Sequence, residues 1–537
     1  MKRIVLSAML FSALAFNAQN SKRPNNWFNL DAAKDSVQGV STERTYEELL
    51  KNKKSTTVIV GVIDSGVDYE HEDLKSVMWV NQGEIPGNGI DDDKNGYIDD
   101  IHGWNFIGGA DGKNVDKDNL EMTRLVRKYK DKYLGKKESD FSDKQEKNEF
   151  RIFEAAYADY SKKYRSDSAM YVKYRGMAES LQALNGKVKA SLSVDTIRYE
   201  ELSKYSTSDE LEKSTLELSK KTLSQNKEAS LDDFISMVQP GVDHFKNSVE
   251  YHLNLNFDPR SIVGDDYNNS AEKVYGNSDC KGPDSFHGTH VAGIIAAARK
   301  NGVGMDGVAS DVRIMSVRCV PDGDERDKDV ANSIRYAVDN GASIINMSFG
   351  KKFSWDKKVV DDAVKYAESK GVLLIHAAGN DAVNIDEVAH YPCKKFEGKG
   401  EAENFMDIGA LSWKPEEKMV APFSNYGKKT VDVFSPGVDI YSTTPENGYR
   451  DASGTSMAAP VACGVAAVLK SYYPTLTPQQ IKKIIVKSSV KNNKSKKVIK
   501  PGTKDEMVRF DKLSKTAGIV NMYEAVKMAE KFAKTKT

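Results

Sequence analysis

The sequence predicts an α/β protein with three layers, in which a central, mostly parallel sheet is interrupted by an α-helical insertion. Segments of strand length alternate with amphipathic helices after about residue 285, which favours a parallel sheet with right-handed crossovers. A β-branched run at 57–63 has the composition of a strand buried on both faces. Residues 121–250 are instead highly charged and carry apolar side chains at helical spacing.

The N-terminus has the pattern of a secretory signal peptide. Met1-Lys2-Arg3 is a basic start, 4–16 is an apolar stretch too short to span a bilayer, and Phe16-Asn17-Ala18 resembles a cleavage site. We therefore expect a signal peptide over 1–18 and export to the periplasm or the medium. An N-terminal extension would follow over 19–55. No later apolar run has the length of a transmembrane segment.

The charge balance argues against some classes of partner. Lys and Arg total 78, Asp and Glu total 78, and the formal net charge is zero. This balance gives no reason to expect nucleic acid or an anionic membrane as a partner. The oligomeric state is not indicated by the sequence.

Four cysteines allow disulfides in an exported protein. Cys319 and Cys463 lie in apolar stretches and are expected to be buried thiols, whereas Cys280 and Cys393 lie in loop-like sequence. The second two are therefore the expected pair, although four cysteines permit three full pairings.

The first part of the α/β domain, 56–114, carries a carboxylate at a strand end. The strand at 57–63 is followed by Asp64-Ser65-Gly66. Open parallel sheets bind their ligands at the carboxyl ends of their strands. Asp64 is therefore a candidate functional residue, with a turn or helix cap as the competing interpretation.

An acidic loop in the same part predicts a structural calcium ion. The spacing of its oxygen donors follows the EF-hand loop, but His102 occupies the twelfth position in place of the usual bidentate Glu. A metal-free acidic turn is the alternative. The predicted ligands are Asp91, Asp93, Asn95, Tyr97 through its carbonyl, and Asp99 or Asp100.

Residues 115–255 are predicted to be a charged helical insertion. Within 121–250 there are 24 Lys and Arg and 23 Asp and Glu residues, a mixture typical of a solvated surface. We expect its apolar side chains to form the insertion's own core. They step at helical spacing at Phe150, Phe153, Tyr157, Tyr160 and Tyr164, and again at Leu181, Leu184, Val188 and Leu192.

Residues 256–537 hold the second part of the α/β domain and end in helices. His287 lies at the start of an apolar helix, and Ser456 lies among small residues at the start of another, where a serine is most often a cap. Further strands are expected at 312–320, 343–347 and 372–378, and helices at 328–340, 357–370, 477–487 and 519–533.

Four motifs together resemble the subtilisin-like serine proteases, the subtilases of peptidase family S8. In chain order they are Asp64-Ser65-Gly66, His287-Gly288-Thr289-His290, Ala377-Ala378-Gly379-Asn380 and Gly454-Thr455-Ser456-Met457-Ala458-Ala459-Pro460. The resemblance covers roughly 55–110 and 255–535. It implies a subtilisin-like three-layer fold.

The resemblance also implies roles for these residues. Ser456 would be the nucleophile, His287 its general base, and Asp64 the carboxylate that orients the imidazole. Asn380 and the Ser456 backbone N–H would bind the oxyanion, and this chemistry needs no cofactor. An extended substrate would pair with one segment as an added strand. The implied substrate-binding residues are Ser348, Phe349, Gly350, Ala378 and Gly379.

The resemblance therefore predicts an exported serine endopeptidase that acts on proteins or peptides through an acyl-enzyme intermediate. The alternative is a catalytically silent subtilase-fold protein whose helical insertion binds a protein partner. An α/β-hydrolase esterase is disfavoured, because G-x-S-x-G is absent and the order of the motifs differs.

The insertion is the main departure from the family pattern. Asp64 and His287 are 223 residues apart (287 − 64), where related catalytic domains need a few dozen. Residues 19–55 are too few for the separate N-terminal propeptide domain that family members commonly carry. We hypothesise that the insertion lies near the cleft and restricts substrates, or acts as a lid or internal chaperone.

Overall fold

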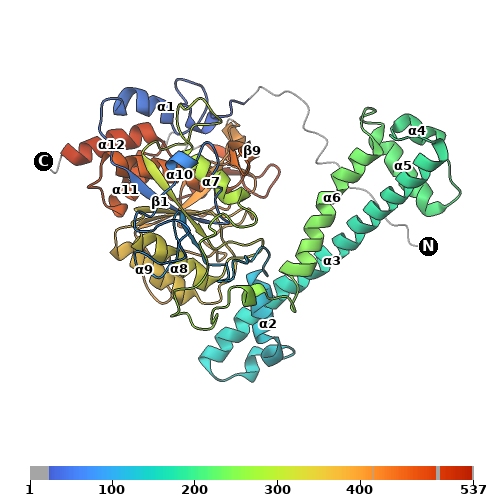
Figure 1. Ribbon diagram of the computed structural model, residues 1–537, viewed down its shortest axis with the longest axis horizontal. Coiled ribbons are helices and arrows are strands. Elements are labelled where there is room, and N and C mark those ends of the chain that lie inside the picture. Colours follow the sequence, from blue (N-terminus) through green and yellow to red (C-terminus); the bar gives the residue numbers. More distant parts are fainter. Residues whose placement is uncertain (1–22, 415, 491–495, 535–537) are drawn as a thin grey trace.

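A seven-stranded sheet forms the centre of the computed structural model, which describes residues 23–414, 416–490 and 496–534 (Figure 1). The predicted signal peptide, 1–18, lies outside the described residues. Every neighbouring pair in the order β2-β3-β1-β4-β5-β6-β7 is parallel, which confirms the predicted sheet. The strands are β1 (Val58–Asp64), β2 (Gly103–Asn105), β3 (Val312–Arg318), β4 (Ile344–Met347), β5 (Leu373–Ala377), β6 (Phe405–Leu411) and β7 (Val431–Pro436).

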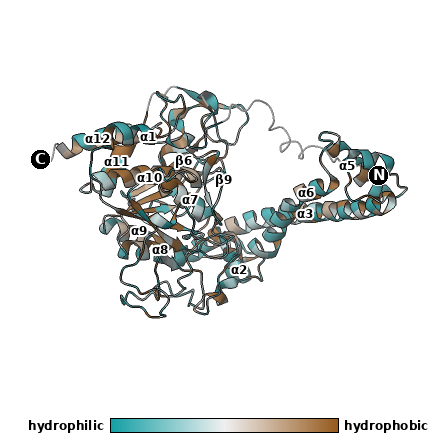
Figure 2. Cartoon of the chain, turned by 45° about the horizontal axis from the view of Figure 1, so that its top comes forward, coloured by the Kyte–Doolittle hydropathy of each residue, from teal (hydrophilic) through white to brown (hydrophobic). Residues whose placement is uncertain are grey.

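Helices cover both faces of this sheet and complete the three layers. The alternate residues Val58, Val60 and Val62 of β1 pack into one apolar core, while Ile63 packs into the core on the opposite face. Figure 2 shows these interior strands and α10 as the most apolar part of the chain. One face is covered by α7 (Phe286–Ala296), α10 (Thr455–Tyr472), α11 (Pro478–Ser488) and α12 (Met522–Lys534), and the other by α8 (Asp327–Asp339) and α9 (Lys357–Ser369).

Smaller elements surround the sheet. The N-terminal extension packs on the first core through Trp27 and Phe28. Among the described residues, no helix is both long and apolar enough to cross a bilayer. The smaller helices are η1 (Trp27–Asn29), α1 (Thr42–Thr45), η2 (Tyr46–Leu50), η3 (Lys75–Val77), η6 (Pro259–Ile262), η7 (Glu416–Lys418) and η8 (Phe510–Lys512). The hairpins are β8 (Ile440–Thr444) with β9 (Gly448–Ala452), and β10 (Lys497–Ile499) with β11 (Met507–Arg509).

The predicted insertion is helical and forms an arm that projects from the sheet domain (Figure 1). The long helices α3 and α6 lie side by side, with α4 and α5 at the far end. Leu181, Leu184 and Val188 are buried in a core at that end, as the spacing predicted. The same prediction is wrong for Tyr157 and Tyr164, which are exposed on α3. The arm consists of α2 (Glu121–Tyr133), η4 (Glu138–Asp140), α3 (Lys144–Leu192), α4 (Tyr199–Lys204), α5 (Glu210–Leu223), α6 (Leu231–Asn247) and η5 (Ser248–His252).

The predicted disulfide between Cys280 and Cys393 is wrong, since all four cysteines, each within the described residues, are free thiols. The Cys280 carbonyl accepts a hydrogen bond from Ser316 on β3, whereas Cys393 lies in the connection between β5 and β6. Strands β1 and β4 separate β3 from β5 in the sheet, and each strand adds about 4.8 Å. A disulfide needs Cα atoms within about 7 Å, which this placement does not allow.

Candidate active site

Asp64 and His287 meet at the carboxyl edge of the sheet. Asp64 is the last residue of β1, and its buried carboxylate accepts hydrogen bonds from His287 Nδ1 (2.7 Å) and from the Ser65 backbone N–H (2.8 Å). His287 is the second residue of α7. A Cβ at Gly288 would lie 2.1 Å from the Gly66 carbonyl oxygen. Glycine at that position therefore lets the helix start approach the strand end.

The environment of His287 favours its protonated form. Burial alone would lower the pKa of the imidazole, but the charge of Asp64 and its hydrogen bond outweigh burial and raise that pKa above 6.5. The bond to Nδ1 leaves Nε2 as the nitrogen available to a neighbouring hydroxyl.

Ser456 is the second residue of α10 and contacts the segment that follows β4. Its hydroxyl donates to the Ser348 carbonyl (3.0 Å), and the Ser348 hydroxyl donates to the Ser456 carbonyl (2.9 Å). Pro460, the sixth residue of the helix, has no N–H for the Ser456 carbonyl, four residues earlier. The Ser348 hydroxyl replaces the missing donor.

The Ser456 hydroxyl donates to Ser348, and no hydrogen bond joins it to His287 among the described residues. Hydroxyl groups rotate readily, and catalytic hydrogen bonds often form only when substrate is bound. General-base catalysis requires the hydroxyl to turn toward His287 Nε2.

Asn380 follows β5, and Thr455 fixes its side chain. Its Oδ1 accepts hydrogen bonds from the Thr455 backbone N–H (2.8 Å) and hydroxyl (2.9 Å). Among the described residues, Nδ2 has no acceptor and is therefore free to donate to a ligand beside Ser456. Sequence reasoning did not assign this orienting role to Thr455, whose only signal was its position beside the serine.

The predicted substrate-binding segments leave the same edge of the sheet. Ser348, Phe349 and Gly350 follow β4, while Ala378 and Gly379 follow the adjacent strand β5. The motifs named from the sequence thus converge at the carboxyl ends of neighbouring strands, where parallel sheets bind ligands.

A cleft of about 270 Å³ lies beside Asp64 and His287. Three of its carboxylates, Asp116, Asp284 and Asp322, were not singled out from the sequence, because each lies in a separate loop. Its lining comprises Asp64, Ser65, Asp116, Asp284, His287, Arg318, Val320, Pro321, Asp322, Ser348 and Phe349.

The arm reaches the rim of this cleft through its last helical turn. His252 Nε2 lies 3.0 Å from Asp322 Oδ1, and Lys117 Nζ lies 3.1 Å from Asp322 Oδ2. The hydrogen bond from His252 lowers the pKa of Asp322 to about 2 despite its partial burial. Only the base of the arm makes these contacts, while its far end stands clear of the sheet domain (Figure 1).

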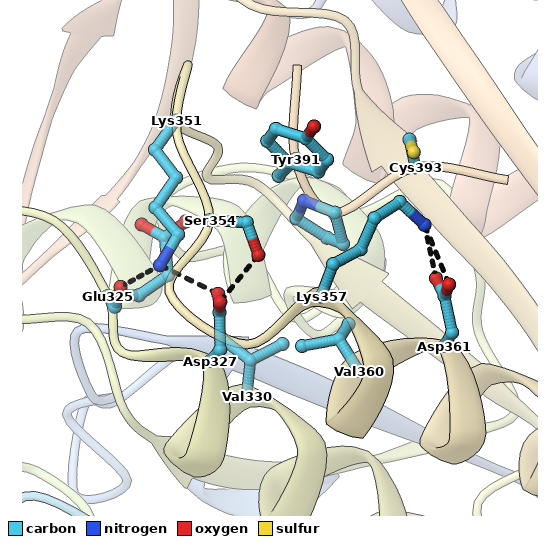
Figure 3. A pocket seen from close by; sticks show the side chains of 11 residues that line it. Glu325, Asp327, Val330, Lys351, Ser354, Lys357, Val360, Asp361, Tyr391 and Cys393 are labelled. Carbon is cyan, nitrogen blue, oxygen red and sulfur yellow. Dashed lines mark hydrogen bonds and ion pairs between the residues drawn. The ribbon is translucent and has the colours of Figure 1, made fainter. Parts of the chain in front are cut away.

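A buried ionic cluster holds the base of the arm to the predicted substrate-binding segment 348–350. Lys351 directly follows Gly350, and its ammonium pairs with Glu121 of α2 (2.6 Å) and with Asp327 (2.8 Å). Figure 3 shows Lys351 pointing toward Asp327 and Glu325, whose carbonyl also accepts from it. The cluster was missed in the sequence because Glu121 and Lys351 lie 230 residues apart.

The acidic loop differs in detail from the predicted calcium site. Carboxylate oxygens of Asp93 and Asp100 come within 4.8 Å of one another and of Glu84, which the spacing did not predict. The other predicted ligands use their oxygens within the loop. Asp91 accepts from the Asn95 and Gly96 N–H groups, Asn95 Oδ1 accepts from the Tyr97 N–H, and Asp99 accepts from the N–H groups of Gly87, Asn88 and Gly89.

Comparisons with known proteins find similarity to proteases. A model of the subtilase family, peptidase S8, matches residues 55–507. A thermophilic serine proteinase of Bacillus sp. strain AK1 is 42% identical over 187 residues, which are 34% of this chain and 42% of that protein. Subtilisin DY of Bacillus licheniformis is 34% identical over 198 residues, which are 36% of this chain and 67% of that protein.

Among solved structures, a protease of Pseudoalteromonas arctica is 28% identical, covers 47% of this chain and 78% of its own, and has a TM-score of 0.38. The chain spans less than half the length of the Bacillus sp. AK1 relative. The family match, by contrast, extends over most of the sequence and includes all four motifs. The chain therefore belongs to the subtilase family of serine endopeptidases.

Proposed function

We propose that this chain is an exported serine endopeptidase, in which Ser456 attacks the peptide carbonyl and His287 takes the serine proton. The observation that carries the proposal is the 2.7 Å bond between His287 and the buried Asp64, at the edge where Ser456 and Asn380 also lie. His287 would give this proton to the leaving amine as the C–N bond breaks, and water would then hydrolyse the acyl-enzyme with His287 acting again as base. Protein or peptide chains are the proposed substrates.

The direct test is covalent labelling of the purified chain with a fluorophosphonate. We expect a single adduct on the peptide that contains Ser456, together with cleavage of unfolded casein. The silent alternative, in which the arm is a binding module, predicts neither labelling nor cleavage. Sequencing the N-terminus of the exported protein tests the proposed removal of residues 1–18.

Asn380 is expected to stabilise the oxyanion through Nδ2. Asn380→Ala and Asn380→Asp should each lower kcat by about 10²–10³-fold with little change in KM, a size taken from subtilisin, a relative, and not from this geometry. The aspartate variant keeps an acceptor for Thr455 but loses the donor. Steady-state kinetics on a peptide anilide measure both. Full activity of the aspartate variant would remove Asn380 from the mechanism.

The pH–rate profile should report the raised pKa of His287. The imidazole acts as a base only when neutral, so kcat/KM should fall as the pH drops through a pKa above 6.5. In Asp64→Asn the carboxylate charge that raises the pKa most is lost, and burial is opposed only by the smaller effect of Asp284, so the pKa of His287 falls. The variant's acidic limb should therefore move to lower pH, while its kcat falls by about 10⁴-fold. An acidic limb at the same pH in both proteins would contradict this assignment.

We also propose that Glu84, Asp93 and Asp100 bind a structural calcium ion, because their clustered carboxylates are hard oxygen donors of the kind Ca²⁺ prefers. At a calcium concentration 100-fold above Kd, binding would stabilise the fold by about 2.7 kcal/mol. Calorimetry should show a higher Tm in calcium than in EDTA. Asp93→Ala should abolish the difference, and the exposed Asp111→Ala should keep it. Equal Tm values for the wild type in calcium and EDTA would refute the site.

A further inference from the structure

The proposed substrate-binding segment 348–350 is fixed to the sheet domain at two points. His376 Nε2 lies 3.0 Å from the Phe349 carbonyl oxygen. Lys351 exchanges two backbone hydrogen bonds with the connection between β5 and β6, one through its N–H (2.9 Å) and one through its carbonyl (2.8 Å). Gly350 lies between these points, and among the described residues neither its N–H nor its carbonyl has a hydrogen-bond partner. Its peptide groups are therefore available to an added substrate strand.

His376 lies in the interior of the sheet domain. It is the fourth residue of β5, and its side chain is fully buried. The ring packs against His390 and Phe405, with centroid distances of 5.2 and 5.4 Å. Its second nitrogen, Nδ1, lies 2.9 Å from Asp407 Oδ1 on the adjacent strand β6. Each of the two ring nitrogens therefore has a protein oxygen as its partner.

Both of these oxygens can only accept hydrogen bonds. A peptide carbonyl has no proton to donate. Burial would raise the pKa of Asp407, but Lys394 and the bond from His376 lower it to about 2, so this carboxylate is ionised at neutral pH. A neutral imidazole has one N–H, so one of its nitrogens would face an acceptor oxygen with no proton between them. The two contacts therefore require a ring that is protonated on both nitrogens.

The buried positive charge of such a ring is paired within the sheet. Asp407 Oδ2 lies 3.2 Å from Lys394 Nζ, which in turn lies 2.9 Å from Asp432 on β7. The two buried carboxylates thus face the two cations, and a charge is tolerated in the interior when it is paired. The neighbouring His390 adds no further charge at neutral pH, because burial, reinforced by His376, lowers its pKa to about 4.

We propose that His376 is a positioning residue, whose doubly protonated ring holds the Phe349 carbonyl in the core and thereby presents Gly350 to the substrate backbone. The role rests on the proposed endopeptidase function. The Ser348 carbonyl faces the site, where it accepts from Ser456, whereas the next carbonyl faces the core. Without His376 the buried Phe349 carbonyl loses its partner, and the segment must be ordered when substrate binds, which raises KM.

NMR of the full chain, labelled with ¹⁵N at its eight histidines, tests the charge on the ring. At neutral pH we expect one ring to show two slowly exchanging N–H groups, Nδ1–H and Nε2–H. Both signals should disappear in His376→Phe. If no ring of the wild type shows both groups, the proposal is overturned, even if the variant does not fold.

The kinetic test compares a tetrapeptide p-nitroanilide, which extends along the segment, with p-nitrophenyl acetate, which is too short to reach Gly350. His376→Phe is similar in size but has no donor. It should raise KM for the tetrapeptide about tenfold or more and leave its kcat within about threefold. Hydrolysis of the acetate should also stay within about threefold of the wild-type rate. His376→Gln, which keeps an N–H donor, should raise KM less.

His71→Phe is the matched control. His71 is also buried, and its Nε2 lies 3.1 Å from a backbone carbonyl oxygen, that of Gly448, which is not part of the segment. This variant should unfold at a lower urea concentration than the wild type but keep the wild-type KM for the tetrapeptide. An equal rise of KM in His71→Phe and His376→Phe would overturn the positioning role.

An unchanged tetrapeptide KM in a folded His376→Phe variant would also overturn that role, as would an equal loss of activity on both substrates. These results are separable from failure of the proposed function. A wild type that hydrolyses neither substrate and is not labelled by the fluorophosphonate disproves the endopeptidase. A labelled enzyme whose peptide KM does not depend on His376 disproves only the positioning role.

Discussion

Replacing Ser456 by alanine is expected to lower kcat for peptide hydrolysis by about 10⁶-fold, a size taken from subtilisin, a relative, and not from this geometry. The residue lies at the start of a helix, and its hydroxyl donates to the Ser348 carbonyl in the proposed substrate-binding segment. Loss of that bond removes one hydrogen bond and opens no cavity beyond a single oxygen atom. The expected cost in stability is therefore only about 1 kcal/mol.

Ser453→Ala provides the matched control. Ser453 is three residues earlier, and its hydroxyl accepts from the Asp439 N–H (2.8 Å). The control should keep wild-type kcat and fluorophosphonate labelling, while Ser456→Ala should lose both with an unchanged circular dichroism spectrum. Equal residual activity in the two variants would show that another residue is the nucleophile.

Lys351→Met is expected to destabilise the fold by about 3–5 kcal/mol and to raise KM. The substitution leaves the buried Asp327 without its cation and leaves Glu121 with Arg124 alone, which costs far more than the loss of an exposed pair. The segment that ends at Gly350 also loses its attachment to α2, so ordering it around substrate becomes less favourable. Urea unfolding gives the free energy of unfolding, and peptide kinetics give KM.

The neighbouring Lys352→Met is the control for this prediction. Lys352 also pairs with an acid of the arm, Asp159 of α3, but both side chains are largely exposed. An exposed pair contributes about 0–1 kcal/mol, so this variant should unfold close to the wild type. Adding Asp327→Asn to Lys351→Met should recover part of the loss, because it removes the unpaired charge. If Lys351→Met and Lys352→Met destabilise the fold equally, the buried ion pairs of Lys351 do not have the predicted stabilising role.

The buried Glu121, which pairs with Lys351, makes the stability of the fold depend on pH. Burial would raise the pKa of Glu121, but Arg124 and Lys351 lower it to about 2, against 4.5 for an ordinary Glu. A depressed pKa means that the stabilisation is fully present above about pH 4.5 and is lost as the pH falls toward 2. The difference in the free energy of unfolding between Lys351→Met and the wild type should therefore shrink as the pH falls from about 4.5 toward 2.

Features with local causes could be predicted from the sequence. The β-branched composition of β1 and the alternation of strands and helices after α7 indicated a parallel sheet, because burial on both faces leaves a continuous apolar run. The motifs around Asp64, His287, Asn380 and Ser456 then located the site at one edge. The helical spacing of the arm likewise reflects contacts between residues close in the chain.

Features that depend on distant contacts could not be predicted. Glu84 joins Asp93 and Asp100 because the loop between them doubles back, whereas an EF-hand spacing assumes ligands that follow one another along the chain. Glu121 and Lys351 share no motif, and their contact arises only after the base of the arm packs beside the segment that follows β4. In each case the relevant distance is set by the packing of the sheet and not by local propensity.

The arm also determines how the whole molecule moves in solution. At 1.5 Å per residue, the 49 residues of α3 extend about 74 Å, whereas a compact chain of 537 residues has a radius of gyration of about 24 Å. A segment outside the sheet domain therefore sets the longest dimension of the particle. Its hydrodynamic drag and rotational diffusion are those of an elongated body, although the proposed chemistry lies entirely within the compact part.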